Sequence, residues 1–117
     1  AYPTRVGEGP FSTEMTREVS DRLGIQEFGT VTHRQRRIGE WDGEMARYSA
    51  MINGCTQAAI TGIDRVDPLC FGITDYDKLS EKALAFIEIA EEDIGAPVTL
   101  ISTGPDVAHI IDIRDEL

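Results

Sequence analysis

A short and almost wholly apolar run, Ala58–Ile63, restricts the fold of this chain more than any other segment. Its residues are apolar or small at successive positions, which is typical of a strand buried on both faces of a sheet. A helical pattern of apolar residues follows over Leu79–Ile94 and stops at Gly95, and a second strand-like run covers Val98–Ile101. This alternation of short buried strands with helices predicts an α/β fold.

Weaker patterns predict the remaining elements. In chain order they are a loop over residues 1–11, a helix from Ser12 or Thr13 to Gly24 with Met15, Val19 and Leu23 as its buried stripe, a polar loop over Glu27–Gly39, a helix after Asp42 with a small-residue face from Met45 to Asn53, a strand over Leu69–Ile73 and a strand over His109–Ile113. These strands are few for a complete doubly wound sheet. We therefore expect residues 1–117 to be the carboxyl-terminal portion of a larger, predominantly parallel-sheet domain.

The charge balance bears on possible partners. Eleven basic and 21 acidic side chains give a formal net charge of −10, which opposes the phosphate contacts that dominate nucleic-acid binding. No stretch approaches the roughly 20 apolar residues of a membrane span, and no basic-then-apolar leader opens the chain. We expect a soluble, cytoplasmic protein whose partners are neither nucleic acids nor membranes.

Familiar catalytic and metal-binding patterns are missing from the sequence. It contains no GxxxxGK[ST] phosphate loop and no GxSxG nucleophile turn. Cys55 and Cys70 have no ligand-spaced partners, and zinc needs three or four converging ligands, so reduced thiols are expected. His109 lies in an expected strand, which favours a structural role. We expect no catalytic residue and no metal ligand within these 117 residues.

An arginine-rich segment is the first of three candidate ligand-binding regions. Gly29–Gly39 contains Arg34, Arg36 and Arg37 in an otherwise acidic chain. Alternate residues of an extended loop point the same way, so Arg34 and Arg36 could bind one anion together. Guanidinium groups bind carboxylates and phosphates through paired hydrogen bonds. A solvated basic loop paired with acidic side chains is an equally good interpretation of these residues alone.

The other two candidates follow expected strands. Asp64 comes at the carboxyl end of the Ala58–Ile63 run, where open α/β sheets bind ligands, and a carboxylate there can accept hydrogen bonds from guanine. Ser102–Pro105 turns off the end of the next strand, and Gly104 allows a close approach to a planar base. Taken alone, each segment is better explained as an ordinary turn.

Four motifs in sequence give these segments a family context. Val6–Glu14 resembles the VGxGPFPTE segment of adenylosuccinate synthetases, and Glu27–Asp42 resembles their GxTTGRxRRxGWxD loop. Thr61–Asp64 is similar to their TKxD segment, and Ile101–Asp106, followed by Arg114 and Asp115, is similar to their carboxyl terminus. The resemblance extends over essentially the whole chain and implies a piece of a nucleotide-binding ligase fold.

The resemblance implies a reaction and its participants. Members of this family use GTP and Mg²⁺ to phosphorylate the 6-oxygen of IMP, and L-aspartate then displaces the phosphate to give adenylosuccinate. The phosphate loop, the catalytic Asp and His and the Mg²⁺ ligands of the family would lie upstream of this chain. The resemblance therefore implies that these residues alone are inactive, and that the complete protein is a homodimer. Exposed strand edges also favour self-association or contact with the upstream part.

The resemblance also implies ligand-binding roles for the residues at positions that match the family's motifs. The residues implied to bind the substrate aspartate are Thr30, Val31, Thr32, His33, Arg34, Gln35 and Arg36. Arg34 would also contact the IMP ribose, and Arg36 the GTP phosphate region. The residues implied to bind guanine are Gly62, Ile63, Asp64, Ser102, Thr103 and Gly104.

This sequence departs from the family pattern at three of these positions. His33 stands where the family usually has Gly, Val31 where it often has Thr, and Gly62 where it has Lys. The first two changes put the closure of the arginine loop in question, and the third removes a cation from the guanine segment. A non-catalytic nucleotide- or anion-binding module, and a purely structural assembly domain, remain alternatives to the ligase.

Overall fold

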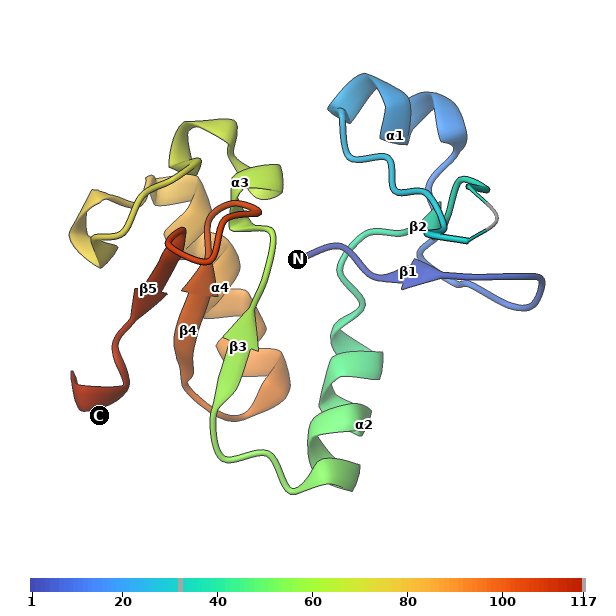
Figure 1. Cartoon of the computed structure of the whole chain (residues 1–117). Helices are drawn as coiled ribbons and strands as arrows, with labels where there is room; N and C mark the ends of the chain where they lie inside the picture. Colours follow the sequence, from blue (N-terminus) through green and yellow to red (C-terminus); the bar gives the residue numbers. More distant parts are fainter. Residues whose placement is uncertain (32, 117) are drawn as a thin grey trace. The chain divides into compact units, whose positions relative to one another are not determined.

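The computed structural model describes residues 1–31 and 33–116, and the chain divides into two compact units. One unit comprises Tyr2–Asp42, and the other comprises Gly43–Leu117 together with Ala1. Figure 1 labels the helices and strands of both units. Within the described residues, every helix is too short or too polar to traverse a lipid bilayer.

A small antiparallel pairing organises the Tyr2–Asp42 unit. β1 (Thr4–Arg5) pairs with β2 (Arg37–Ile38), and Thr4 lies opposite Ile38. The side chains of Ile25 and Ile38 form the core, with 1% and 2% of their surface exposed. The sequence did not reveal β1, because two residues are too few to show the alternation of a strand.

Helix α1 (Arg17–Leu23) begins later than the sequence predicted. The expected N-cap at Ser12 or Thr13 is wrong, since Thr16 is the N-cap and its hydroxyl accepts a hydrogen bond from a backbone N–H three residues on at 3.3 Å. Upstream of Thr16 the backbone bonds to β2 and the residue after it instead of forming a helix. The Met15 N–H donates to the carbonyl of the last β2 residue at 2.9 Å, which keeps this stretch out of the helix.

The predicted buried stripe of α1 is only partly right. Met15 and Val19 are half-buried, but Leu23 is 52% exposed, and Ser20 is the buried residue of the helix. The predicted end is confirmed, because Gly24 closes the helix in the left-handed conformation with φ 68°.

The Gly43–Leu117 unit contains a three-stranded sheet in the order β3-β4-β5. β3 (Ala58–Ile60) runs parallel to β4 (Val98–Ser102), and β5 (Ile110–Asp112) runs antiparallel to β4. The predicted first strand is thus shorter than its apolar run, because the chain turns into a helix at Ile63. Three paired isoleucines form a buried row across the sheet: Ile60, Ile101 and Ile111.

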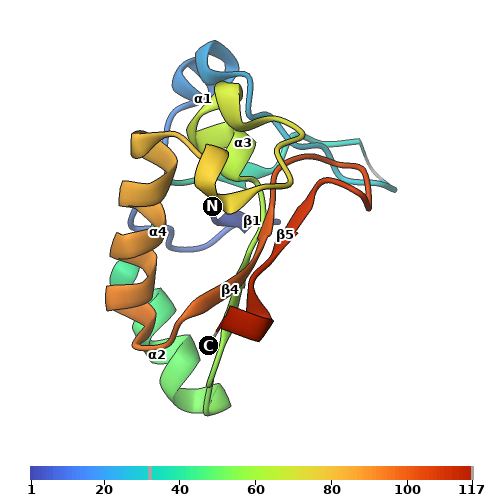
Figure 2. The ribbon, with the colours of Figure 1, turned by 90° about the vertical axis from the view of Figure 1, so that its left-hand side faces the viewer.

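Two helices lie on one face of this sheet, as Figure 2 shows. α4 (Glu81–Ile94) is capped by the Ser80 hydroxyl, which accepts from the Ala83 N–H at 3.2 Å, and it ends at Gly95 as the sequence predicted. α2 (Gly43–Asn53) packs against α4. These helices and strands confirm the predicted α/β class.

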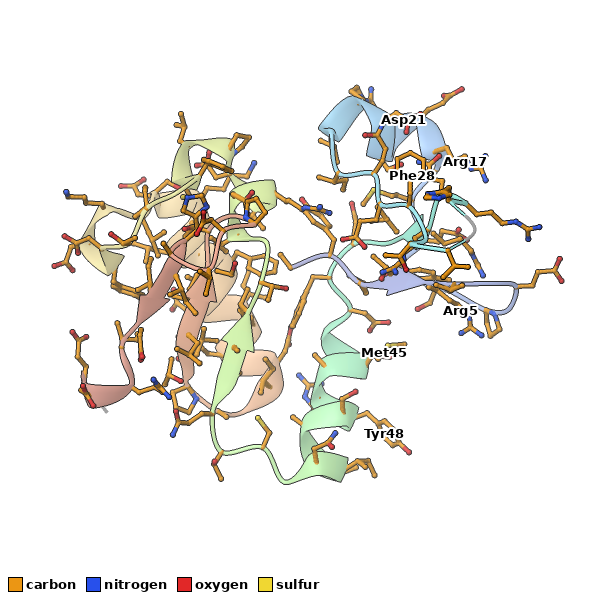
Figure 3. All side chains as sticks on the ribbon, viewed as in Figure 1. Arg5, Arg17, Asp21, Phe28, Met45 and Tyr48 are labelled. Atoms are coloured by element: carbon orange, nitrogen blue, oxygen red, sulfur yellow. The ribbon has the colours of Figure 1, made fainter. Side chains whose placement is uncertain are left out.

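Much of the apolar surface of α2 is uncovered. The expectation of a small-residue packing face holds for Ala46 and Ala50, which are half-buried, but Met45 and Ile52 are 59% and 64% exposed. Tyr48 is 62% exposed, and Figure 3 shows it projecting from the same side of the helix as Met45. Met45, Tyr48 and Ile52 thus form an exposed apolar stripe along α2.

The strand expected over Leu69–Ile73 is wrong. α3 (Ile63–Val66) is followed by a 3₁₀ turn over Pro68–Cys70, and the Asp67 carboxylate caps this turn by accepting from the Leu69 N–H at 3.0 Å. Proline cannot donate to a sheet and aspartate favours such local bonds, so the pair starts a turn. Two more 3₁₀ turns cover Tyr76–Lys78 and Arg114–Glu116.

Candidate functional site

Parallel pairing of β3 and β4 brings two of the candidate segments to one edge of the sheet. Asp64 lies in α3, directly beyond β3, and Ser102–Gly104 leads off the end of β4. α3 also contacts β4, and Figure 1 shows α3 and the turn after β4 at the same end of the strands. We call this region, formed by Gly62–Asp64 and Ser102–Gly104, the strand-end edge.

Asp64 is held on a well-anchored turn of helix. Ile63 is fully buried and Val66 is 9% exposed, so the two residues fix α3 against the core on either side of Asp64. Gly62 precedes the helix with φ 74°, a left-handed conformation that favours glycine. Asp64 itself is half-buried, and within the described residues its carboxylate makes no hydrogen bond or ion pair. Its oxygens are therefore free to accept hydrogen bonds from a ligand.

Thr103 holds the turn after β4 in shape. Its side chain is fully buried, and its hydroxyl donates to the Ile73 carbonyl at 2.8 Å. Its N–H donates to the His109 carbonyl at 2.9 Å, and its own carbonyl accepts from the Gly72 N–H at 3.1 Å. Of the three residues predicted to line a guanine pocket here, Thr103 thus has its polar groups engaged inside the protein.

Ser102 and Gly104 remain as the accessible members of that turn. Both are half-buried, and the Ser102 hydroxyl donates to the Gly104 carbonyl at 3.0 Å, which tightens the bend. The hydroxyl oxygen keeps its acceptor capacity, so Ser102 can still accept a hydrogen bond from a ligand.

His109 packs against this turn and supports it. Its ring packs edge-on against Phe71, with centroids 5.1 Å apart, and its Nδ1 is buried without a hydrogen-bond partner. A Cβ on Gly104 would lie 2.3 Å from that Nδ1, so the glycine is required by the imidazole ring and not only by a ligand. The structural role predicted for His109 therefore agrees with its packing.

The arginine-rich segment lies in the other unit and forms a narrow hairpin. The Arg36 N–H donates to the Glu27 carbonyl at 2.7 Å, and the Gly29 N–H donates to the Arg34 carbonyl at 2.8 Å. Phe28 pairs with Gln35 between these bonds. Thr30, Val31, His33 and Arg34 are exposed at the tip, while the predicted Thr32 falls outside the described residues.

His33 explains how this loop closes without the glycine of the family pattern. Its φ is 56°, and within the described residues it is the only non-glycine residue with a positive φ. The imidazole-bearing residue thus adopts the conformation that glycine adopts without strain. His33 therefore holds a left-handed turn in this chain at the cost of local backbone strain.

The three arginines of the segment differ in how far their guanidinium groups are already paired within the protein. Arg37 is fully engaged: its Nε and Nη2 each donate to a Glu14 carboxylate oxygen at 2.8 Å, and its Nη1 donates to the Gly7 carbonyl at 2.9 Å. This pairing lowers the pKa of Glu14 and raises the pKa of Arg37. Arg37 therefore supports the fold and does not offer a free cation.

Arg34 and Arg36 remain available for an anion. Within the described residues the Arg34 guanidinium makes no hydrogen bond or ion pair, and the Arg36 side chain pairs only with Glu27, whose carboxylate lies 3.5 Å from Nη1. The buried Nε of Arg36 has no hydrogen-bond partner. Gln35 is held by its amide, which donates to Asp21 Oδ1 at 3.1 Å.

A hollow of about 450 Å³ opens beside Arg36. Its lining residues are Phe11, Glu14, Met15, Thr16, Arg17, Ser20, Gln35, Arg36, Arg37 and Ile38. Figure 3 shows Arg17 and Asp21 on α1 in this unit. The lining carries more positive than negative side chains, so the hollow suits an anionic group. Arg34 is not among the lining residues, so the prediction that Arg34 and Arg36 grip one anion remains a prediction.

The geometry of the strand-end edge defines a class of protein. An α/β unit with an unpaired carboxylate and a tight glycine-containing turn at the carboxyl ends of neighbouring parallel strands matches the open α/β proteins that bind ligands at that edge. A family model described as adenylosuccinate synthetase matches residues 1–70. The chain belongs to the adenylosuccinate synthetase family, as its motifs predicted.

Individual relatives agree with this assignment. The chain is 63% identical over 115 residues to the adenylosuccinate synthetase of Archaeoglobus fulgidus and 60% identical over 117 residues to that of Pyrococcus horikoshii. These matches cover 98% and 100% of this chain and 34% of each relative. The chain thus spans about a third of the length of these curated relatives.

Two solved structures have a similar fold. A fully ligated adenylosuccinate synthetase from Plasmodium falciparum matches with a TM-score of 0.84 and 26% identity, covering 95% of this chain and 38% of that one. A cyanophage S-2L succinoaminodeoxyadenylate synthetase, bound to dGMP and dATP, matches with a TM-score of 0.70 and 22% identity, covering 96% and 31%. The second likeness concerns the fold alone.

The predicted site residues are divided between the two units. Asp64 and Ser102–Gly104 lie at one edge, but the arginine hairpin belongs to the other unit, so its convergence with them on one ligand stays a prediction. Within residues 1–31 and 33–116, no group of three or more His, Cys, Asp and Glu side chains could hold a metal ion.

Proposed function

We propose that this chain is part of a GTP-dependent ligase that joins L-aspartate to IMP to form adenylosuccinate, and that it supplies aspartate- and GTP-binding residues. The observation that carries the proposal is the unpaired Asp64 carboxylate at the strand-end edge of a chain that belongs to this family. The chain spans about a third of its relatives, so the complete activity depends on residues outside it.

The strand-end edge would recognise the guanine of GTP. A carboxylate with two free oxygens can accept from the N1–H and the exocyclic amine of guanine together, and adenine offers no such pair of donors. Asp64 meets this requirement because α3 fixes it between two buried residues. Ser102 and Gly104 would border the base, while Thr103 holds the turn that carries them.

The arginine hairpin would bind the anionic substrates. Arg34 at its tip and Arg36 at its base have guanidinium donors to offer, and these suit the two carboxylates of aspartate and the phosphates of GTP. Arg34 would also contact the ribose of IMP. The exposed Thr30 and Val31 would approach the aspartate substrate from the same tip.

Phosphoryl transfer needs little covalent chemistry from the protein, and positioning and charge neutralisation supply most of the rate enhancement. In this proposal Mg²⁺ would neutralise phosphate charge, with ligands provided outside this chain. The complete protein would work as a cytoplasmic homodimer. The chain alone would be inactive, because a general base must lie within hydrogen-bond reach of its substrate and none is expected here.

A calorimetric titration of the chain with GTP tests the proposal. We expect saturable binding that weakens at least tenfold in D64N, because two hydrogen bonds to a charged group are worth about 1.5–3 kcal/mol each. R47A, on α2 and paired with Asp93, is the matched control and should bind like the wild type. Binding that is absent from the wild type, or unaffected by D64N, contradicts the proposal.

An assay of adenylosuccinate formation distinguishes the ligase from the alternative, a non-catalytic nucleotide-binding module. The protein expressed from its complete gene should form adenylosuccinate from IMP, aspartate and GTP, and the purified chain should not. Nucleotide binding without adenylosuccinate formation by the complete protein would favour the module instead.

A further inference from the structure

Arg65 follows Asp64 directly and lies beside the strand-end edge. A Cβ built on Gly62 would lie 3.6 Å from Arg65 Cδ and 4.0 Å from Arg65 Cγ, so the stem of the arginine passes over the glycine. The Arg65 N–H donates to the Gly62 carbonyl at 3.0 Å and closes the turn between them. The arginine is half-buried, which indicates that its stem is packed.

The distribution of charge makes Arg65 unusual in this unit. It is the only basic residue between Arg47 and Lys78, and no Lys or Arg occurs between Lys82 and Arg114. Both segments of the strand-end edge fall in these two stretches. Arg65 is therefore the one Lys or Arg that the local sequence of this edge supplies to stack on an electron-rich aromatic base.

Helix geometry separates the directions of Asp64 and Arg65. Successive residues of a helix point about 100° apart, so a base whose edge meets Asp64 is approached by Arg65 from a different side. Gly62 has no side chain to cover that side, and the stem of Arg65 lies over it. A guanidinium group is planar and stacks favourably on the face of an aromatic ring.

We propose that Arg65 covers one face of the guanine ring whose edge Asp64 reads, and so contributes to the affinity for purine nucleotides. This inference rests on the proposed function. The contact is with the base and not with the phosphates. It should therefore be present for guanosine as well as for GTP, and it should be insensitive to the exocyclic amine at position 2.

The test uses the protein expressed from its complete gene and compares R65A, R65M and R65K with D64N. GTP, ITP and guanosine are the probes, with equilibrium dissociation constants as the readout. R65A should weaken all three by a similar factor, about three- to thirtyfold. R65M keeps an apolar stem but lacks the guanidinium group, so weaker binding in R65M as well as in R65A is due to the lost guanidinium and not to a folding defect. R65K should bind with an affinity between those of the wild type and R65A. R47A is the control for loss of a surface arginine.

Each outcome decides between distinct explanations. D64N should weaken GTP more than ITP, because ITP lacks the 2-amino group, whereas the Arg65 variants should weaken both equally. If R65A and R65M bind like the wild type while D64N is impaired, the inference about Arg65 is wrong and the proposed function stands. A loss for GTP but not for guanosine would assign Arg65 to the phosphates and also overturn it. If D64N has no effect either, the proposed function fails as well.

Discussion

Replacing Gly104 with alanine should damage the strand-end edge through a single steric conflict. The new Cβ would lie 2.3 Å from Nδ1, 3.1 Å from Cγ and 3.3 Å from Cβ of His109, whereas ordinary contacts fall at 3.4–4 Å. The imidazole ring can move away only by giving up its edge-on contact with Phe71. Overpacking of this kind costs about 1–3 kcal/mol. We expect G104A to lower the free energy of unfolding by that amount.

A double-mutant cycle measures this conflict directly. Thermal unfolding of G104A should show a melting temperature lower by about 4–8 °C for each kcal/mol lost. Adding H109A removes the ring that the new methyl group meets, so the double variant should recover most of the loss caused by G104A. The interaction energy between the two substitutions should be about 0.5–3 kcal/mol.

G95A is the matched control for this cycle. Gly95 ends α4 with φ 75°, and a Cβ there meets nothing within 4 Å. G95A should lose stability from backbone strain alone, and H109A should not restore it. The reasoning is refuted if G104A melts like the wild type, or if H109A adds to its loss instead of relieving it.

Three further predictions concern other parts of the chain. H33G should raise the free energy of unfolding by up to about 1 kcal/mol in a denaturant titration, because it relieves a left-handed residue, and H33V should lower it; the reverse order would show that φ 56° is not strained. Hydrogen bonds from the side chain and the backbone N–H of Arg114 hold the pKa of Asp112 at about 2, below its usual 3.8, so Asp112 adds stability above pH 3.8 that is lost as the pH falls through about 2. In R114A a carboxyl NMR titration should show this pKa rising toward 3.8 without reaching it, because the backbone N–H of residue 114 still donates, and an unchanged pKa contradicts the side-chain pairing. The double variant of α2, M45K with Y48K, should reduce self-association of the isolated chain in sedimentation experiments, whereas equal association in both proteins would exclude this apolar stripe as the contact.

Local patterns with several agreeing signals predicted the structure well. α4 has apolar periodicity, a serine before its first turn and a glycine after its last, and the structure contains each of these features. β4 and the short final strand β5 followed in the same way. Helix caps and periodic burial act within a few residues, so a single sequence contains the information that fixes them.

Elements that depend on distant partners were predicted poorly. The start of α1 was misplaced because the residues before Thr16 pair with Gly39 and Ile38, which lie more than twenty residues on. The strand expected over Leu69–Ile73 was wrong for a local reason, because the Asp67–Pro68 turn outweighed the apolar residues after it. Apolar composition over five residues cannot tell a buried strand from a turn.

In the candidate site, too, features fixed by neighbouring residues were predicted and features fixed by distant residues were missed. The position of Asp64 at a strand end followed from the apolar run before it, but the engagement of Thr103 inside the turn depends on Ile73 and His109. The contact between Gly104 and His109 was missed because the ring is placed by Phe71. At His33 the sequence showed only a departure from the family pattern, whereas the backbone angle shows how the turn accommodates it.

A crystal structure of the protein expressed from its complete gene, bound to IMP, aspartate and a non-hydrolysable GTP analogue, tests the account most directly. The account predicts that the Asp64 carboxylate accepts hydrogen bonds from guanine N1 and N2 beside Ser102–Gly104, with Arg34 and Arg36 contacting aspartate or phosphate oxygens of the same ligand set. Guanine bound away from Asp64, or the arginine hairpin on a face remote from every ligand, would contradict it.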